Sequence, residues 1–407
     1  MPVHRLTEKE ELLESDRICS IAFVSPWDRE EAIRGLESPD FQPTVSFGHF
    51  TEEGQLTASL LLPQFQMRYE GHDVPMVGVG GVASLPEYRY GGAVRQIFHT
   101  ALEWMWDQGA VFSSLYPFSH SYYRKFGYEL CQLVTQYKLP TEALESFSCT
   151  CKVRMFQPGE DLAPLQAVYN ARLGQYNLAV QREERHWKSL FGKDPAKEMR
   201  YTYLLEGAGG PLAYVIFKPE EGEDGKIGNV RELAFAKPEG LRQALGFLYR
   251  LGAQYEAFRI ALPEDVPLAT LLEESYDTAP TWINQPMARV IHVEKALQAK
   301  VPGEGRSYTV AVEDQLLPGN NGVFQVSQQG GRRHRGKTAG GRPGRPHRGR
   351  AGANPAAHRL PLPGGGPVQA RRHPVRQPGD AAPGLPQAGG LPYRPVLNRE
   401  GPVLPLL

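Results

Sequence analysis

The sequence has few of the features that mark membrane or secreted proteins. Only four of its 407 residues are cysteines, and their spacing is too irregular for a disulfide framework. No apolar run is long enough to cross a bilayer, and the charged N-terminal segment 1–16 lacks the apolar core of a signal peptide. We therefore expect reduced cysteines, a cytoplasmic location and no membrane partner.

Metal-binding and nucleotide-binding motifs are missing as well. Cys149 and Cys151 have one residue between them, whereas zinc sites separate such pairs by about two to four, and no second pair follows. Gly91 and Gly92 are followed by neither the Gly-Lys-Ser/Thr of a P-loop nor the spacing G-x-G-x-x-G. The sequence thus predicts no metal site and argues against the usual nucleotide-binding loops.

Charge is distributed unevenly along the chain. The 45 basic and 45 acidic residues cancel, but residues 332–407 hold 14 of the basic and 2 of the acidic ones, which leaves 31 basic and 43 acidic residues before them. A body with a net charge near −12 argues against nucleic acid as a partner and suits a cationic amine substrate. Acidic runs such as 8–14 also fit a plain solvated helix face, which is the simpler interpretation.

The stretch 74–128 is the best-defined part of the sequence. Small and β-branched residues predict a buried strand that ends near Leu85, with Gly80 and Gly81 marking a bulge or a close ligand approach. A turn over 86–92 leads into a helix whose apolar stripe has the three-and-four spacing: Val94, Ile97, Phe98, Ala101, Leu102 and Met105. Gly109 should end this helix, and a strand over 111–115 completes a βαβ unit with parallel strands.

The glycine turn before this helix predicts a site for an anion. Backbone N–H groups at a helix start point outward together, and the helix dipole adds partial positive charge. Arg89 and Arg95 flank the turn and strengthen the site for a phosphate or pyrophosphate. With P-loop and dinucleotide spacings absent, coenzyme A is the best candidate ligand.

These residues also carry a resemblance to a known family. The segment Arg89–Val94 resembles the R/Q-x-x-G-x-G/A loop of GNAT acetyltransferases, and the segments GGVASLPEYR and SYYRKFGYEL are similar to the Eis (enhanced intracellular survival) family. Val94 is larger than the last residue of the generic loop. The resemblance is sharp only over 74–128.

The resemblance implies acetyl-CoA as the co-substrate and a set of site residues. The pyrophosphate is expected at Arg89, Tyr90, Gly91, Gly92, Ala93, Val94 and Arg95, the pantetheine arm at Val82, Ala83 and Ser84, and closure over the cofactor at Phe118 and Ser119.

Two catalytic groups are implied in the same way. Tyr123 matches the family's general acid, and we expect Arg124 and Lys125 to lower its pKa. The chain's own terminal carboxylate, here on Leu407, matches the general base. On residue chemistry alone a packed ring is the favoured interpretation of Tyr123, and the match to the family motif reverses this preference. His120 is a less favoured candidate base.

The resemblance implies an α/β (α+β) architecture with tandem domains. We expect an N-terminal catalytic GNAT domain over 1–146, a second, degenerate GNAT domain over 147–287, the start of a sterol-carrier-protein-like domain over 288–330, and a low-complexity tail over 331–407. In the second domain a helix over 239–254 should stand between strands 229–235 and 259–262, but the turn 237–241 lacks a glycine pair with flanking arginines. We therefore expect that domain not to hold coenzyme A.

Several local expectations accompany this layout. Thr7 and Glu10 have the spacing of a capping box, and a strand over 130–139 should close the first domain. The segments 288–297 and 308–327 should be strands, with the hairpin turn at 320–322. The tail, rich in Gly, Pro and Arg, is either a disordered basic arm or an out-of-frame translation, and we favour the latter.

Three functions fit the sequence. The first is acetyl-CoA-dependent N-acetylation of a primary amine of the aminoglycoside, polyamine or lysine type, in a homo-oligomer, as the family resemblance implies. We expect the aberrant tail to impair this activity. The alternatives are tRNA-dependent aminoacyl transfer of the Fem type, which the acidic body disfavours, and a non-catalytic coenzyme-A-binding protein.

Overall fold

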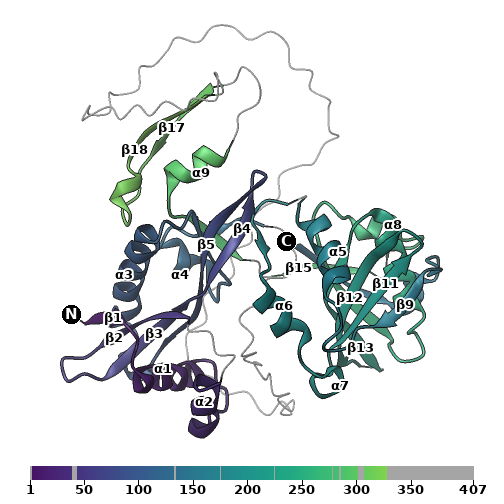
Figure 1. Cartoon of the computed structure of the whole chain (residues 1–407), viewed down its shortest axis with the longest axis horizontal. Coiled ribbons are helices and arrows are strands. Elements are labelled where there is room, and N and C mark those ends of the chain that lie inside the picture. The colour runs from purple at the N-terminus through teal and green to yellow at the C-terminus, as the bar shows by residue number, and fades with distance from the viewer. Residues whose placement is uncertain are drawn as a thin grey trace, which may run out of the picture. The chain divides into compact units, whose positions relative to one another are not determined.

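Figure 1 shows a computed structural model of the chain, which describes residues 2–38, 44–132, 134–174, 176–223, 225–276, 278–283, 286–300 and 307–327. The expectations for the tail 331–407, including the place of the Leu407 carboxylate, lie outside these residues. The described chain forms two large mixed sheets and a separate two-stranded ribbon. No helix in this described part is long and apolar enough to cross a membrane.

The first sheet contains the predicted βαβ unit. Its strands run in the order β1 (Val3–Arg5), β2 (Val45–Phe50), β3 (Leu56–Leu62), β5 (His72–Ser84), β6 (Phe112–Leu115), β16 (Met287–Val290) and β7 (Glu129–Leu130). The strand β4 (Gln64–Tyr69) pairs with both β5 and β10 (Ala179–Gln181). Strands β5 and β6 are parallel, as the sequence predicted.

Helices cover both faces of this sheet. The helix α1 (Lys9–Ala22) lies on one face with α2 (Arg29–Leu36) beside it, and α3 (Ala93–Asp107) lies on the other (Figure 1). The predicted stripe of α3 is buried from Ile97 to Met105, with Val94 partly buried, and Gly109 follows the helix with a positive φ of 74°. The capping box of α1 is formed by Glu8 and Glu11, so the prediction of Thr7 and Glu10 was one residue too early.

The second sheet repeats the βαβ unit. Its order is β15 (Ala279–Trp282), β8 (Val134–Pro140), β14 (Ala257–Pro263), β13 (Lys226–Phe235), β12 (Gly210–Glu221), β11 (Tyr201–Gly207) and β9 (Lys152–Met155). Strands β13 and β14 are parallel and are joined by α8 (Pro238–Tyr249), which confirms the second βαβ unit. The helices α5 (Ala163–Leu173), α6 (Glu184–Phe191) and α7 (Pro195–Glu198) precede β11.

The two sheets exchange strands, which the sequence did not predict. The strand expected to close the first domain is interrupted: β7 stays in the first sheet, whereas β8 pairs with β14 and β15 in the second. In return β16, from far along the chain, lies between β6 and β7. The predicted end of the first domain at residue 146 therefore does not coincide with the change from one sheet to the other, because β8 already belongs to the second sheet.

The segment after β16 also departs from the prediction. Residues 288–297 are not one strand, since β16 ends at Val290 and is followed by the helix α9 (Val293–Ala299). The ribbon strands β17 (Ser307–Val312) and β18 (Gly322–Ser327) pair as expected. Their connection is longer than the predicted tight turn, since it runs from Glu313 to Asn321 and includes a 3₁₀ turn at Pro318–Asn320.

Candidate functional site

The first feature of the site is a separation between β5 and β6. Their pairing covers only Met76–Val79 and Phe112–Leu115. Beyond it, β5 continues to Ser84 and pairs with β3 alone in the described chain. The edge of β5 that faced β6 is therefore left without a strand partner over its last residues, among them Val82, Ala83 and Ser84.

The backbone at this edge can bind an extended ligand. The Leu85 N–H donates to the Thr57 carbonyl on the β3 side at 2.9 Å. Successive backbone groups of a strand point to opposite edges, so Val82 and Ser84 direct theirs to the open edge. Ala83, which was predicted to bind the same arm, lies opposite Ser59 and directs its backbone groups to β3 instead. Gly81, with φ of 54°, marks the irregularity where the β3–β5 register shifts. A pantetheine arm has the amide groups to pair with such an edge.

The second feature is the loop that enters α3. Gly92 is the N-cap residue in the left-handed region, with φ of 86°, and Tyr90 is a fully exposed non-glycine residue with φ of 67°. In the described chain no acceptor is found for the N–H groups of residues 92–95, because the first bond of the helix runs from Gln96 N–H to the Gly92 carbonyl. Four N–H groups without an acceptor thus lie together at the positive end of a 15-residue helix.

Two arginines lie on this loop without acidic partners among the described residues. Arg89 and Arg95 are both exposed. Arg95 lies close enough to Tyr122 to act on its pKa, which burial raises and the guanidinium partly lowers again. The start of α3 and the short helix α4 (His120–Arg124) are therefore neighbours. The residues that fit a pyrophosphate lie next to the helix that bears Tyr123.

Tyr123 lies in an aromatic cluster at that place. Its side chain is only 3% exposed, and its ring centroid lies 6.0 Å from that of Phe98 on α3, 5.3 Å from Phe118 and 5.3 Å from Tyr122. The described residues offer no hydrogen-bond partner for its hydroxyl. Burial, helped by Tyr122 and Tyr128, raises the Tyr123 pKa well above its usual value.

The expectation that Arg124 and Lys125 lower this pKa was therefore wrong. Arg124 makes two hydrogen bonds to the Glu129 carboxylate, at 2.8 and 2.7 Å, and Lys125 lies 5.8 Å from the centre of the Tyr122 ring. Both cations thus face other groups. Tyr123 therefore keeps its proton through the neutral range, as an ordinary tyrosine also does.

The residues just before α4 also lie beside the Tyr123 ring. Ser119 caps α4, its hydroxyl accepting the Tyr122 N–H at 3.3 Å, and Phe118 stands 71% exposed beside the Tyr123 ring. Two buried polar atoms here, the Tyr116 hydroxyl and the His120 Nε2, have no partner in the described chain. No sequence pattern predicts this environment of Tyr116, because its burial depends on the packing of distant segments.

The second βαβ unit lacks the corresponding loop. Only Ala236 and Lys237 stand between β13 and α8, and the Ala236 N–H is used by the Leu212 carbonyl at 3.0 Å. Pro238 removes another donor at the start of α8, where Glu239 adds negative charge. Gly240 packs so closely that a Cβ would lie 2.4 Å from the Leu212 oxygen. This helix start offers little to a pyrophosphate, in agreement with the sequence.

Among the described residues, no group of three or more His, Cys, Asp and Glu side chains is placed so that it could hold a metal ion. All four cysteines are free. The Sγ atoms of Cys149 and Cys151 lie 3.7 Å apart, but burial raises the pKa of Cys151 to about 11, so this thiol is unreactive at neutral pH.

Comparisons with known proteins agree with this geometry. No curated protein sequence matches the chain. Among solved structures it is similar to a GCN5-related N-acetyltransferase from Anabaena variabilis (22% identity, TM-score 0.71) and to Eis1 from Mycobacterium abscessus (21% identity, TM-score 0.67); each match covers 83% of this chain and 86% of the other. A probable N-acyltransferase from Enterococcus faecalis (23% identity, TM-score 0.69) matches over 79% of this chain and 81% of its own.

The family comparison locates both domains in the sequence. A model described as an acetyltransferase (GNAT) domain matches residues 5–131, and a second model with the same description matches residues 178–290. The matched segments contain the two βαβ units, β5–α3–β6 and β13–α8–β14. The chain is therefore a mixed α/β protein with two GNAT domains in tandem.

Proposed function

We propose that the first GNAT domain transfers an acetyl group from acetyl-CoA to a primary amine. The observation that carries this proposal is the convergence of an open β5 edge, an N-terminal helix end with four unused N–H groups, and the buried Tyr123, all within residues 80–123. The second domain has the same fold without these features. The co-substrate binds once, in the first domain.

The roles of the residues follow from their chemistry. Residues 89–95 hold the pyrophosphate with backbone N–H groups and the charges of Arg89 and Arg95, while the backbone groups of Val82 and Ser84 pair with the pantetheine arm. Phe118 and Ser119 close the site beside the thioester. Bound acetyl-CoA supplies the acetyl group in activated form. Tyr123, which is protonated at neutral pH, gives its proton to the departing thiolate sulfur.

The amine must lose its own proton before it attacks. The Leu407 carboxylate, proposed as the base, lies outside the described residues. A cationic acceptor is favoured by the excess of acidic over basic residues before position 332. Aminoglycosides, polyamines and lysine side chains all provide such an amine, so the proposal covers this class of substrate.

The proposal is tested by incubating the full chain with acetyl-CoA and a panel of these amines, followed by mass spectrometry. We expect the mass of one acetyl group on an amine nitrogen, with release of free thiol. Aminoacylation that depends on charged tRNA would instead support a Fem-type transferase. Binding of acetyl-CoA by calorimetry without any acetylated amine would indicate a binding protein and overturn the catalytic proposal.

A further inference from the structure

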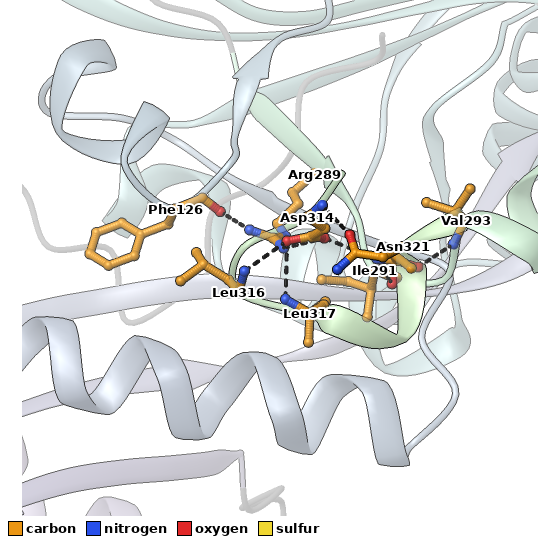
Figure 2. A network of polar contacts seen from close by, with 9 residues as sticks. Phe126, Arg289, Ile291, Val293, Asp314, Leu316, Leu317 and Asn321 are labelled. Carbon is orange, nitrogen blue, oxygen red and sulfur yellow. Dashed lines mark hydrogen bonds and ion pairs between the residues drawn. The ribbon is translucent and has the colours of Figure 1, made fainter. Parts of the chain in front are cut away.

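A buried ion pair lies behind the turn that carries Tyr123. Arg289, on β16, is 5% exposed, and its Nη2 donates to both carboxylate oxygens of Asp314 at 2.7 Å (Figure 2). Its Nη1 donates to the carbonyl oxygen of Phe126. One guanidinium thus joins the connection between β17 and β18 to the segment that follows α4.

Asp314 is itself held firmly in place. Its Oδ1 accepts the N–H groups of Leu316 and Leu317, each at 3.0 Å, and its Oδ2 accepts the Asn320 amide at 3.0 Å. Burial alone would raise the Asp314 pKa, but the Asn320 hydrogen bond and the Arg289 charge outweigh it and lower the pKa. The carboxylate is therefore ionised at neutral pH and fixes the guanidinium plane.

The Asn320 side chain ties this carboxylate to the segment that follows β16, the strand of Arg289. Its Nδ2 also donates to the Ile291 carbonyl at 2.9 Å, and its Oδ1 accepts the Val293 N–H at 3.0 Å. Asn320 is 1% exposed, so these bonds are shielded from water. Figure 2 shows the same connection from Phe126 through Arg289 and Asp314 to Val293.

The Phe126 carbonyl belongs to the turn that ends α4. The Tyr128 N–H donates to the Tyr123 carbonyl at 3.3 Å and the Gly127 N–H to the Arg124 carbonyl at 3.0 Å, which is the Schellman pattern with Gly127 in the left-handed region. A Cβ on Gly127 would lie 2.6 Å from Arg289 Nη1. Arg289 thus presses on the turn and takes up a carbonyl that the helix end leaves free.

We propose that Arg289, oriented by Asp314, is a positioning residue for Tyr123. The backbone of Tyr123 is bonded to the turn, the turn is held by the guanidinium, and the hydroxyl of Tyr123 has no hydrogen bond of its own to fix it. Loosening the guanidinium lets the α4 turn shift, and a shift of about 1 Å in a catalytic group can cost up to roughly 10²-fold in rate. This inference rests on the proposed role of Tyr123 as the acid.

The first test is a double-mutant cycle on the full chain. We expect D314N to lower kcat about 10-fold and to leave the KM for acetyl-CoA within about 2-fold, because residues 82–95 lie on other elements. If Asp314 acts through Tyr123, D314N has little further effect on kcat in the Tyr123→Phe background. An equal loss of kcat in both backgrounds would overturn the inference while leaving the proposed function intact.

A matched control separates positioning from stability. Arg182 and Glu232 form another buried pair, at 2.6 Å and with side chains 4% and 2% exposed, whose acidic partner lies on β13 in the second sheet. E232Q should lower the melting temperature at least as much as D314N yet leave kcat of the remaining folded protein unchanged. R289K keeps the positive charge but loses the two guanidinium nitrogens that bond Phe126 and Asp314 at the same time. This variant should reduce kcat even if D314N fails to fold.

A third measurement does not depend on turnover. With 3-fluorotyrosine at the 18 tyrosines, the ¹⁹F signal of Tyr123 is assigned as the one missing from the Tyr123→Phe protein. D314N or R289K should shift or broaden this signal, and E232Q should not. An unchanged Tyr123 signal in both variants overturns the positioning role, whereas a chain that acetylates no amine overturns only the proposed function.

Discussion

Gly92 combines a positive φ with an unused backbone N–H at the start of α3. Its φ of 86° is costly for any residue with a Cβ, and its N–H lies among the unused donors at the start of α3. The space around it is open, since an added Cβ would have no atom within 4 Å. A side chain placed here therefore has room beside the donors that we propose bind the pyrophosphate.

We predict that Gly92→Glu abolishes acetyl-CoA binding. Two like charges about 4 Å apart at a protein surface repel by roughly 4 kcal/mol, or about a thousandfold in affinity. Gly54→Glu is the matched control, since Gly54 also has a positive φ, of 85°, and open space, but lies in the turn before β3. Calorimetry should show wild-type affinity for the control; unchanged affinity in Gly92→Glu would remove the cofactor assignment.

Tyr123→Phe should lower turnover and spare cofactor binding. A proton donor in the transition state contributes typically about 10²–10⁴-fold, and the ring packing against Phe98 survives the substitution. The ordinary pKa of tyrosine is 10, and that of Tyr123 is raised above it. Ionisation of Tyr123 should therefore not limit the wild-type rate below pH 10. Tyr169→Phe, a buried tyrosine of the second domain, is the control. Full turnover in Tyr123→Phe would assign Tyr123 to the core alone.

The residues of the site differ in how far the sequence can predict them. The loop over 89–95 is a contiguous motif, so its spacing alone places four N–H groups at one helix end. Arg289 cannot be recognised in this way, because the pairing of β16 with β6 and β7 brings it to Phe126 from far along the chain. The pKa of Tyr123 was predicted in the wrong direction for a related reason: neighbours in sequence were taken as neighbours in space.

Elements were predictable where their signal is local. The stripe of α3 and the buried strand that ends near Leu85 depend on residues within one segment, and the structure confirms them. The strand exchange of β8 and β16 depends on partners more than a hundred residues away, such as Val134 with Pro263 and Met287 with Leu115. Periodicity describes which face a strand buries but does not name its partner.

At the scale of elements, glycines set how closely α8 approaches its surroundings. A Cβ on Gly246 would lie 2.5 Å from the Ser148 carbonyl carbon and 2.6 Å from the Cys149 nitrogen, both backbone atoms that cannot swing away. Gly246→Ala should therefore destabilise the protein by about 1–3 kcal/mol despite the better helix propensity of alanine. Gly209→Ala, with nothing within 4 Å, is the control. Denaturant unfolding that shows no loss for Gly246→Ala would contradict this packing.

For the whole molecule, the strand exchange makes the first sheet depend on the far end of the described chain. Met287 and Leu317 lie in the same buried cluster as Ile97 and Phe98, and β16 supplies the pairing between β6 and β7. We predict that a fragment of residues 1–132 melts without a cooperative transition, whereas residues 1–327 melt cooperatively. Circular dichroism with temperature makes the comparison. A cooperative melt of the short fragment would show that the sheet closes without β16.

The tandem arrangement also predicts how many co-substrate molecules one chain binds. The first domain has an eight-residue passage, 85–92, between β5 and α3, and leaves four N–H groups unused; the second has two residues between β13 and α8. There Pro238 and the bond from Ala236 to Leu212 remove donors, and Glu239 would repel a phosphate. Titration of the full chain with acetyl-CoA should therefore give a stoichiometry of one per chain, and Gly92→Glu should reduce it to zero. Residual binding in that variant would place a second site outside the first domain and overturn the assignment of the second domain as one that cannot hold the cofactor.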